Sequence, residues 1–244
     1  MWRGFGLSVP MRISIIIPVR NEAAVIVGTL GRLQRYRKAG HQLILVDGGS
    51  GDATVSLATP WVDQLLVCAP GRARQMNHGA QQATGDWLLF LHADTQLPEA
   101  MDWLIEHHLQ SKSTWGRFDL RLSGRHWIFR IVERMINLRS RWTGIATGDQ
   151  ALFVRRDTFE KIGGFASIAL MEDIDLSRRL KKITAPICIS QPVTTSSRRW
   201  EERGIFRTIV QMWWLRLLYF CGVTPEKLVK IYYCADSNSA KNRG

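Results

Sequence analysis

The sequence predicts an α/β protein in which a mostly parallel sheet is flanked by helices. Two observations predict this fold. Short, mostly apolar runs at residues 13–18 and 43–47 alternate with segments whose apolar residues recur at helical spacing. Such runs are typical of strands covered on both faces, and their alternation with helices indicates βαβ units and a parallel sheet. In sheets of this kind the ligand lies beyond the carboxyl ends of the strands.

The first half of the chain divides into four strand–helix units. Asn21 can cap the helix after the first strand, Glu22 lies in its first turn, and Gly40 marks its end. A turn with the sequence DGGSGD follows the second strand, and Pro98 lies near the start of the last helix. We expect strands at residues 13–18, 43–47, 64–68 and 87–92, and helices at residues 21–39, from 52–54 onward, at 73–83 and at 98–110.

The second half of the chain is less regular. Phe118, Leu120 and Leu122 share one face of a predicted strand, and apolar and basic residues alternate at helical spacing after it. Gly163 and Gly164 close a short helix. We expect strands at residues 115–122 and 151–155, and helices at residues 126–141, 157–162, 173–182 and 203–221.

The chain is strongly basic, with a net charge of +12. This charge favours an anionic partner such as nucleotide phosphates, an anionic membrane surface or nucleic acid, although solubility alone is the simpler interpretation. No nucleic-acid partner is expected, because no zinc-finger, RNP-like or basic-zipper pattern occurs. The four cysteines lie far apart without a CxxC pair, which argues against zinc or thioredoxin-like sites and favours the cytosol.

The run LLFLHADT, residues 88–95, ends abruptly in a histidine, an alanine and an aspartate. His92 and Asp94 are two residues apart, and alternate residues of a strand point the same way. An imidazole nitrogen and a carboxylate oxygen suit Mn²⁺ or Mg²⁺, of which Mn²⁺ tolerates nitrogen better. We therefore predict that these two residues share a divalent cation. The alternative is a core histidine followed by a helix cap.

Two further polar segments follow predicted strands. Asp47 precedes two glycines, so its carboxylate can accept hydrogen bonds from a base or sugar while the backbone approaches a ligand. An Asx turn is the alternative. Arg72 and Arg74 lie where the third strand gives way to a helix, where arginines can hold a phosphate or simply form a solvated turn.

A second acidic cluster, MEDID, lies at the start of a predicted helix. A carboxylate in partly apolar surroundings can act as a general base, and we assign this role to Asp173, with Glu172 as a second catalytic candidate. Helix capping by Asp173 is the alternative. Downstream, Arg199 and Trp200 belong to a basic, aromatic cluster that could clamp a diphosphate leaving group or anchor the next helix.

The chain resembles the family 2 glycosyltransferases of the GT-A fold through motifs that occur in the family's order. IIIPVRNE resembles the opening strand and Pro-x-x-Asn-Glu turn, and LVDGGSGDAT resembles the Asp-Asp-Gly-Ser-x-Asp loop. LHADT resembles the end of the segment with the metal-binding Asp-x-Asp, and MEDIDLSRRL the Glu-Asp segment with the proposed base. SRRW is similar to the Gln-x-x-Arg-Trp element of processive members. Taken together, the sequence motifs, including LHADT, GDQALFVRR, LMED and SRRWEERG, look most like those of a bacterial subgroup, the radical-SAM/selenodomain-associated transferases. Some members of this subgroup are named arsenosugar-biosynthesis glycosyltransferases.

The resemblance implies a nucleotide-diphospho-sugar transferase with a Rossmann-like sheet, an NDP-sugar donor, often a UDP-sugar, and inversion at the anomeric carbon. Asp94, with His92, would hold a Mn²⁺ or Mg²⁺ ion that bridges the diphosphate, and Asp173 would deprotonate an acceptor hydroxyl. The donor would be held by Pro18, Arg20, Glu22, Asp47, Arg74, Asp94, Arg199 and Trp200.

Three departures from the family pattern matter. His92 replaces the first Asp of Asp-x-Asp, so the metal preference is open. Gly48 replaces the second Asp of Asp-Asp-Gly-Ser, which removes one nucleotide contact. Ser196 replaces the Gln of Gln-x-x-Arg-Trp, and because no transmembrane helix is expected, a processive polymer synthase is not predicted.

On this basis we expect one GT-A domain over residues 12–234, preceded by a flexible leader. The expected division is a leader at 1–11, a nucleotide-binding half at 12–110, an acceptor half at 111–202, amphipathic C-terminal helices at 203–234 and a polar tail at 235–244. The start of the chain has no apolar stretch of signal-peptide length, which agrees with a cytoplasmic location.

Residues 203–223 form an aromatic-rich amphipathic segment with arginines at its flanks. Such a helix can lie at the cytoplasmic face of an anionic membrane, pack on the sheet, or form a homo-oligomer contact. The acceptor, a small molecule or a lipid, is not identified by the sequence. The alternative functions are a nucleotidyltransferase, which would show a Gly-rich loop with Arg and Lys after the first strand, and a non-catalytic nucleotide-sugar-binding protein, which would tend to lack MEDID.

Overall fold

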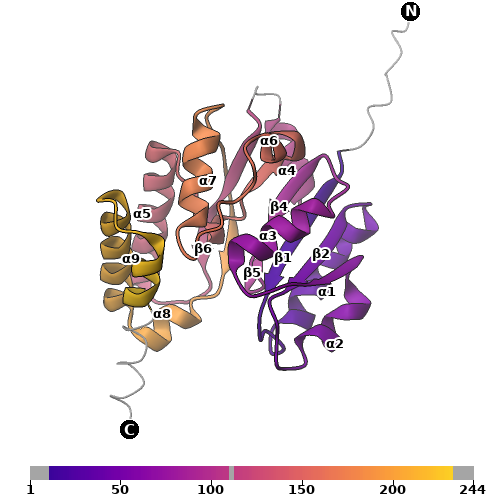
Figure 1. Ribbon diagram of the computed structural model, residues 1–244, viewed down its shortest axis with the longest axis horizontal. Coiled ribbons are helices and arrows are strands. Elements are labelled where there is room, and N and C mark those ends of the chain that lie inside the picture. The colour runs from indigo at the N-terminus through magenta and orange to yellow at the C-terminus, as the bar shows by residue number, and fades with distance from the viewer. Residues whose placement is uncertain (1–10, 110–112, 233–244) are drawn as a thin grey trace, which may run out of the picture.

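A computed structural model describes residues 11–109 and 113–232, apart from the side chain of Arg199 (Figure 1). Within these residues one sheet has the strand order β3-β2-β1-β4-β7-β6-β8-β5. The strands are β1 (Ile13–Val19), β2 (Gln42–Asp47), β3 (Gln64–Val67), β4 (Trp87–Phe90), β5 (Thr95–Gln96), β6 (Trp115–Leu122), β7 (Phe153–Arg155) and β8 (Ile187–Thr195).

The parallel sheet that the sequence predicts occurs in the first half of the chain. β3, β2, β1 and β4 are all parallel, and the register pairs Val19 with Asp47 at the carboxyl ends of β1 and β2. The second half is mixed, because β7 runs antiparallel to both β4 and β6, and β5 runs antiparallel to β8. Among the strands described in this half, only β6 and β8 are parallel to each other.

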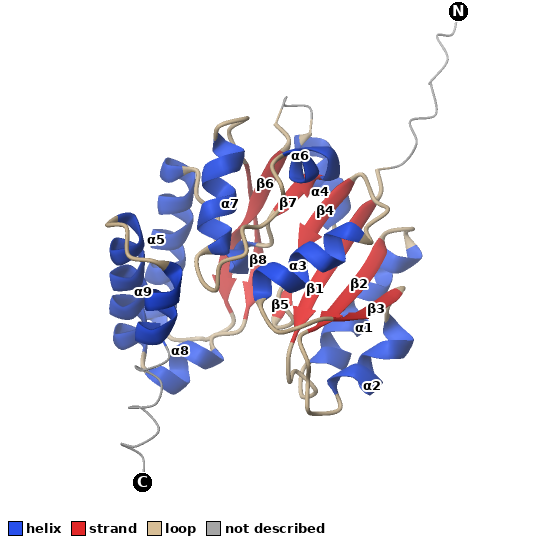
Figure 2. Cartoon of the chain, in the orientation of Figure 1, coloured by secondary structure: helices blue, strands red, loops and turns tan. Residues whose placement is uncertain are grey.

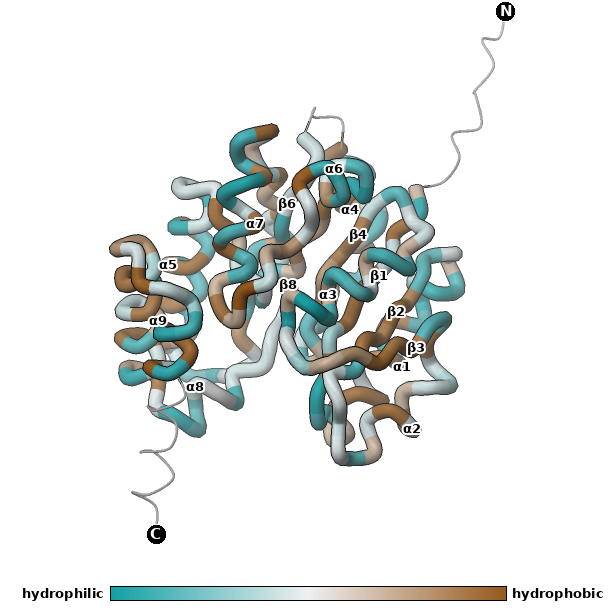
Figure 3. Tube along the Cα trace, viewed as in Figure 1, coloured by the Kyte–Doolittle hydropathy of each residue, from teal (hydrophilic) through white to brown (hydrophobic). Residues whose placement is uncertain are grey.

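Helices cover both faces of the sheet, which explains why β1 is apolar on both sides (Figure 2). Ile13, Ile15 and Ile17 belong to one core with residues of α1 (Ile26–Lys38), α4 (Met101–His108) and α5 (Trp127–Thr143). Ile16 belongs to a second core with residues of α3 (Arg72–Gln81), α6 (Arg156–Lys161) and α7 (Glu172–Lys181). β2 is likewise buried along its whole length, and Figure 3 shows it in the brown of hydrophobic residues.

Several predicted boundaries are wrong for local reasons. Asn21 does not cap the first helix, because it adopts a left-handed backbone (φ 56°) and the helix begins at Ile26 with Val25 as N-cap. The run before His92 leaves the sheet at Phe90, so His92 and Asp94 lie in the turn before β5 rather than on a strand. The last helix of the first half begins at Met101, three residues after Pro98.

The sequence analysis missed β8. Its residues Ser190, Gln191 and Pro192 are exposed, and they interrupt the apolar pattern where the pairing with β6 is irregular between Phe118 and Asp119. The predicted face of Phe118, Leu120 and Leu122 is confirmed, since all three are buried in the first core.

Four short helical segments complete the connections between these elements: α2 (Thr54–Ala58), η1 (Thr59–Trp61), η2 (Gly148–Gln150) and α8 (Arg198–Arg203).

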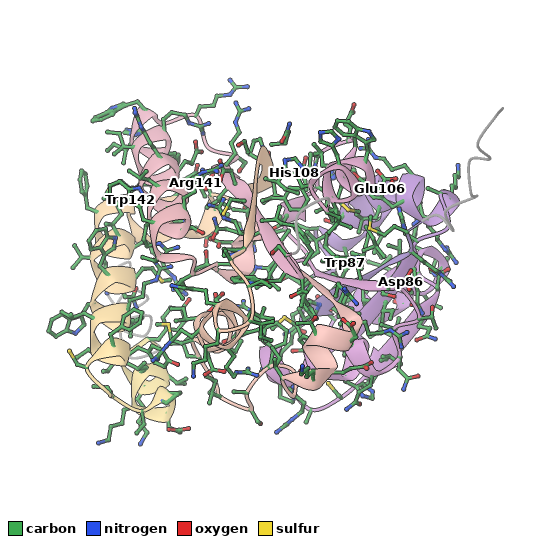
Figure 4. The ribbon with its side chains drawn as sticks, turned by 90° about the horizontal axis from the view of Figure 1, so that it is seen from above. Asp86, Trp87, Glu106, His108, Arg141 and Trp142 are labelled. Carbon is green, nitrogen blue, oxygen red and sulfur yellow. The ribbon has the colours of Figure 1, made fainter. Side chains whose placement is uncertain are left out.

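The C-terminal segment is only partly packed. One side of α9 (Ile205–Phe220) packs through Leu215 on Met171 and Ile174 and on Leu228 and Tyr232 of the helical residues 225–232. The opposite side is exposed, and α9 lies beside α5, whose outer side is exposed too (Figures 1 and 4). We call this surface the outer apolar face; it comprises Trp127, Ile131, Met135, Leu138 and Trp142 of α5 and Phe206, Val210, Trp213, Trp214, Leu217 and Phe220 of α9.

No helix within residues 11–109 and 113–232 is long and apolar enough to cross a membrane. The predicted tail at 235–244, and the predicted leader except Met11, lie outside the described residues.

Candidate active site

A cleft of about 290 Å³ opens at the carboxyl ends of β1 and β4. Its walls come from the first half of the chain on one side and from the starts of α7 and α8 and the middle of α9 on the other. The structure brings seven of the predicted site residues to this cleft: Pro18, Glu22, His92, Asp94, Glu172, Asp173 and Trp200.

The structure does not place the other predicted donor residues in the walls of this cleft. Arg20 and Arg74 are exposed elsewhere, and Asp47 is buried. The Asp47 carboxylate accepts hydrogen bonds from the backbone N–H groups of Gly49 (2.9 Å) and Ser50 (2.8 Å) and from the Ser50 hydroxyl. These bonds form the Asx turn that was the alternative interpretation, so nucleotide binding by Asp47 stays a prediction. The side chain of Arg199 lies outside the described part.

Pro18 and Glu22 are positioned because two loops are tied together. The Asn21 N–H donates to Ser50 Oγ (2.8 Å), and the Gly51 N–H donates back to Asn21 Oδ1 (2.8 Å). The Glu22 N–H donates to Thr54 Oγ1 (2.8 Å). Asn21 therefore cross-links the loops after β1 and β2 instead of capping a helix, which its left-handed backbone permits.

Gly48 has a structural reason to differ from the family's aspartate. A Cβ atom at this position would lie 3.0 Å from the side-chain amide of Gln75. Gln75 is buried, and its Nε2 donates to the carbonyl oxygens of Val19 (2.9 Å) and Val46 (2.8 Å). The glutamine thus joins α3 to the ends of β1 and β2 and fills the space that a longer residue at 48 would need.

The two carboxylates of the acidic cluster have different surroundings. Glu172 is only 5% exposed, and its Oε1 lies 3.9 Å from Arg72 Nη1, which reaches across from the start of α3. Burial, and then the neighbouring Asp173 charge, raise the pKa of Glu172 to about 7, although Arg72 opposes this change. Asp173 is less buried; its Oδ2 accepts the Gly148 N–H at 2.8 Å and its Oδ1 accepts the Ile174 N–H at 2.7 Å.

Replacing Glu172 by Gln is expected to raise the melting temperature more at pH 8 than at pH 5. The folded protein holds the Glu172 proton more tightly than the unfolded chain does, so this group makes stability fall as the pH rises from about 4.5 to about 7. The full effect is up to about 3 kcal/mol. Thermal unfolding at pH 5, 6.5 and 8 measures the change in melting temperature, with Glu106→Gln, at an exposed position, as control. An equal change in melting temperature at every pH would contradict the prediction.

His92, Gly148 and Asp173 lie close together in the wall of the cleft. A Cβ atom on Gly148 would lie 2.8 Å from His92 Nε2 and 3.8 Å from Asp173 Oδ2, so the glycine permits this close approach. Among the described residues, no group of three or more His, Cys, Asp and Glu side chains could hold a metal ion. Asp94 and His92 line the cleft as one carboxylate and one imidazole, which would leave most ligand positions of a Mg²⁺ ion to oxygens of a bound molecule.

Two charged residues that the sequence analysis assigned to no site line the cleft, Asp149 and Arg216, together with Arg72 and Arg198, which belong to basic segments that it considered for phosphate binding. Of the two arginines considered together, Arg72 lines the cleft, with its Nη1 3.9 Å from Glu172 Oε1, whereas Arg74 does not line it. Asp149 Oδ1 is buried without a hydrogen-bond partner among the described residues. Asp149 and Arg216 are isolated in the sequence, so no motif spacing marks them.

Backbone strain collects around the same cleft. Among the described residues, three non-glycine residues have positive φ: Asn21 (56°), Ala151 (47°) and Met171 (68°). Met171 lines the cleft, Asn21 precedes Glu22, and Ala151 follows the turn that holds Gly148. Each such residue costs about 1–3 kcal/mol, and such costs cluster at functional sites.

Sequence comparisons identify related proteins over most of the chain. A family model described as Glycosyl transferase family 2 matches residues 14–166. A "PGL/p-HBAD biosynthesis glycosyltransferase" of Mycobacterium tuberculosis is 31% identical over 226 residues, covering 87% of this chain and 85% of that protein. An "undecaprenyl-phosphate 4-deoxy-4-formamido-L-arabinose transferase" of Pectobacterium atrosepticum is 31% identical over 157 residues, covering 59% of this chain and 47% of that protein.

Solved structures show the same fold at lower identity. The mannosyltransferase PcManGT from Pyrobaculum calidifontis, in complex with GDP-Man and Mn²⁺, has a TM-score of 0.55 and 24% identity. S. aureus TarS 1-349 in complex with UDP has a TM-score of 0.63 and 17% identity. The matches cover 75% and 76% of this chain, but only 56% and 60% of those chains.

Proposed function

Because the chain belongs to glycosyltransferase family 2 and has the GT-A fold, we propose that it is a metal-dependent, inverting transferase. It moves a sugar from an NDP-sugar, most simply a UDP-sugar, to a hydroxyl of a lipid-linked acceptor. The observation that carries this proposal is one cleft that joins the turn holding His92 and Asp94 to the carboxylates Glu172 and Asp173. The likeness to the radical-SAM/selenodomain-associated subgroup stays a prediction from the sequence.

The proposed reaction is a single displacement. Asp173 accepts the proton of the acceptor hydroxyl, and that oxygen bonds to the anomeric carbon on the side opposite the diphosphate. The bond between the anomeric carbon and the diphosphate oxygen breaks, and its electron pair leaves with the nucleotide. The Gly148 N–H holds Asp173 Oδ2, so that the carboxylate keeps a fixed orientation toward the acceptor.

The donor would lie against the residues of the first half, 12–110, and the acceptor against residues 111–202. Arg72 and Arg198 line the cleft and present positive charge to the departing diphosphate. Pro18 and Glu22 would bound the nucleotide side, and Arg20, Asp47, Arg74, Arg199 and Trp200 stay predicted donor contacts.

Asp94 and His92 are the residues that would hold the divalent ion. When bound, such an ion would neutralise the negative charge of the departing nucleoside diphosphate. The GDP-Man and Mn²⁺ complex of the Pyrobaculum mannosyltransferase supports a divalent ion beside the donor, as the UDP complex of TarS supports a uridine nucleotide. The imidazole of His92 favours Mn²⁺ over Mg²⁺.

A lipid-linked acceptor is supported by the outer apolar face. Its residues are strongly exposed, including Trp142 at 80% and Phe206 at 71%, and Trp142 lies at the edge of the molecule (Figure 4). The exposed arginines 130, 134, 141 and 207 lie on the same two helices. Because α9 also lines the cleft through Met212 and Leu215, binding of this face to an anionic, cytoplasmic membrane surface would bring lipid close to the site. The undecaprenyl-phosphate transferase relative agrees with this acceptor class.

Replacing Trp142, Phe206 and Trp213 together by Ser is expected to weaken binding to anionic vesicles by at least about tenfold, since each buried aromatic contributes about 1.5–3 kcal/mol. Co-sedimentation at low and high salt measures this, with Trp103→Ser, an exposed tryptophan on α4, as control. Absence of vesicle binding by the unchanged protein at low salt would contradict the proposal. A dimer in light scattering that the triple variant dissociates would instead assign the face to a homo-oligomer.

A panel of NDP-sugars with Mn²⁺ or Mg²⁺, measured by thermal shift and donor hydrolysis, tests the proposed function. We expect one nucleotide sugar to raise the melting temperature only with metal and to be slowly hydrolysed. Binding without hydrolysis or transfer would favour a non-catalytic binding protein, and release of diphosphate from a nucleoside triphosphate would favour a nucleotidyltransferase. If no nucleotide sugar binds, the proposal fails.

A further inference from the structure

Asp149 lines the cleft, but neither the proposed base nor the proposed metal site includes it. Its Oδ1 is buried without a hydrogen-bond partner among the described residues, and no other carboxylate oxygen of that part of the chain is in this condition. None of the ion pairs between described residues involves Asp149. A shielded carboxylate oxygen without a donor is costly, because it has lost its hydrogen bonds to water. A molecule bound in the cleft can supply the missing donors.

The turn that carries Asp149 does not depend on its carboxylate. A capping box holds η2, in which the Thr147 N–H and hydroxyl donate to Gln150 Oε1 (3.1 and 3.2 Å). The Gln150 N–H donates in return to the Thr147 carbonyl oxygen (2.9 Å). Asp47 is different, because its carboxylate accepts two N–H groups of its own turn. Since the backbone around Asp149 is fixed by its neighbours, the carboxylate has no structural partner to lose when it binds a ligand.

The same turn passes close to both chemical parts of the cleft. Gly148, the residue before Asp149, donates its N–H to Asp173 Oδ2 at 2.8 Å. A Cβ atom on Gly148 would lie 2.8 Å from His92 Nε2. In the proposed reaction the diphosphate lies at His92 and Asp94, and the acceptor hydroxyl lies at Asp173. The sugar would therefore lie beside this turn, because its anomeric carbon stands between the leaving oxygen and the incoming one.

Resting on the proposed function, we propose that Asp149 binds two neighbouring hydroxyl groups of the donor sugar. An ionised carboxylate has two oxygens that only accept hydrogen bonds, and each hydroxyl donates one, so the two groups match. The donor class is then a sugar with two adjacent free hydroxyls. A donor that lacks one of them is rejected, because the carboxylate stays incompletely bonded. Asp149 takes no proton in the reaction, so it determines sugar specificity and does not act as a second base.

Titration calorimetry with Mn²⁺ tests this contact by comparing each nucleotide sugar with its bare nucleoside diphosphate. The probes are UDP-glucose, UDP-galactose, UDP-N-acetylglucosamine and GDP-mannose, with UDP and GDP. We expect Asp149→Asn and Asp149→Ala to weaken binding of the nucleotide sugar at least about tenfold, as for a lost hydrogen bond to a charged group, and to leave the bare nucleotide within twofold. The matched control is Asp175→Asn, since Asp175 is bonded to Arg179 and does not line the cleft.

Removing hydroxyls from the sugar tests the same contact from the side of the ligand. In the unchanged protein, deoxy analogues that lack either of the two adjacent hydroxyls should bind at least about tenfold more weakly than the full nucleotide sugar. In Asp149→Ala the same analogues and the full sugar should bind within twofold of one another, because the partner of those hydroxyls is gone. Analogues that lack a hydroxyl elsewhere on the ring should respond equally in both proteins.

A structural role for Asp149 gives a different result. Removal of an incompletely bonded carboxylate should leave the melting temperature unchanged or raise it. A fall of several degrees in both variants, with equal losses of UDP and UDP-sugar affinity, would mean that Asp149 supports the fold, and the inference is overturned.

The remaining outcomes separate this inference from the proposed function. If both variants bind the nucleotide sugar as tightly as the unchanged protein, Asp149 does not contact the donor sugar and the inference alone is overturned. The same holds if the variants change only the KM for an acceptor, which would assign Asp149 to the acceptor. If none of the four nucleotide sugars binds to the unchanged protein, the proposed function fails, and the inference fails with it.

Discussion

Replacing Asp173 by Asn is expected to keep nucleotide-sugar binding and to lower the transfer rate by roughly 10²–10⁴-fold. A positioned general base contributes about this factor, and an amide cannot accept the hydroxyl proton. Asn is a close steric match, and its carbonyl oxygen can still accept the Gly148 N–H that now bonds to Asp173 Oδ2 at 2.8 Å. The fold and the donor site should therefore survive. Product formation from the donor identified in the panel, together with the donor's binding affinity, measures both parts of this expectation.

The matched control for Asp173 lies on the same helix. Asp175 is bonded to Arg179, with Oδ2 2.8 Å from the Arg179 Nε, and does not line the cleft. Asp175→Asn should lower transfer little while removing the same charge from the same turn of α7. If Asp173→Asn retains full transfer, the base assignment is wrong.

The neighbouring Glu172 offers the sharpest competitor for the role of base. Its raised pKa, about 7, lies near the range in which a general base is most effective, but it is almost fully buried against Arg72. If Glu172 is the base, Glu172→Gln loses transfer and Asp173→Asn keeps it. If Glu172 only shapes the site, Glu172→Gln keeps a substantial rate and moves the pH profile of transfer.

The polar residues around the predicted strand ends could be found from the sequence because they belong to continuous local patterns. An apolar run that stops at His92 and Asp94 marks the carboxyl end of a buried strand, and parallel neighbours bring Pro18 and Glu22 to the same edge. Glu172 and Asp173 were found because two adjacent acids begin a helix. In each case one short stretch of sequence indicated both the secondary-structure element and the polar side chains at its end.

The parts that could not be predicted depend on contacts between distant segments. Asp149 and Arg216 are single charged residues in unrelated stretches, and only the packing of α9 against Met171 and Ile174 brings Arg216 to the cleft. The left-handed backbone of Asn21 follows from its bonds with Ser50 and Gly51, some 30 residues away. Asn21 does form local hydrogen bonds of the kind that favour it at helix caps, but it forms them with the loop after β2 and not with the helix.

The apolar periodicity of residues 203–223 left open whether this helix packs inside the protein or presents an exposed apolar side, and the structure shows that it does both. The side with Thr208 and Leu215 packs inside the protein, while the side with Phe206, Trp213 and Phe220 is exposed. The sequence could not show that α5 would add a second exposed row beside it, because the stripe of Trp127, Ile131 and Trp142 reads equally well as a buried helix face.

Replacing Asp94 by Ala is expected to weaken metal-dependent UDP binding by at least about 100-fold and to abolish transfer. Loss of a residue that only supports a metal ligand costs about 10–100-fold in metal affinity, and loss of the ligand itself should cost at least as much. Asp94 is an exposed carboxylate in the turn between β4 and β5, so alanine should be tolerated without unfolding. Calorimetric titration of UDP with Mn²⁺, with Mg²⁺ and with a chelator separates the metal-dependent part of the affinity.

The control for Asp94 uses the opposite end of the same strand. Asp86 is an exposed aspartate that directly precedes β4 (Figure 4), and Asp86→Ala should leave UDP binding unchanged. If Asp94→Ala loses UDP affinity equally with and without metal, the carboxylate contacts the nucleotide directly and no ion is needed to explain it. His92→Ala then becomes informative: under the metal proposal it lowers affinity with Mn²⁺ more than with Mg²⁺, because only the imidazole distinguishes the two ions.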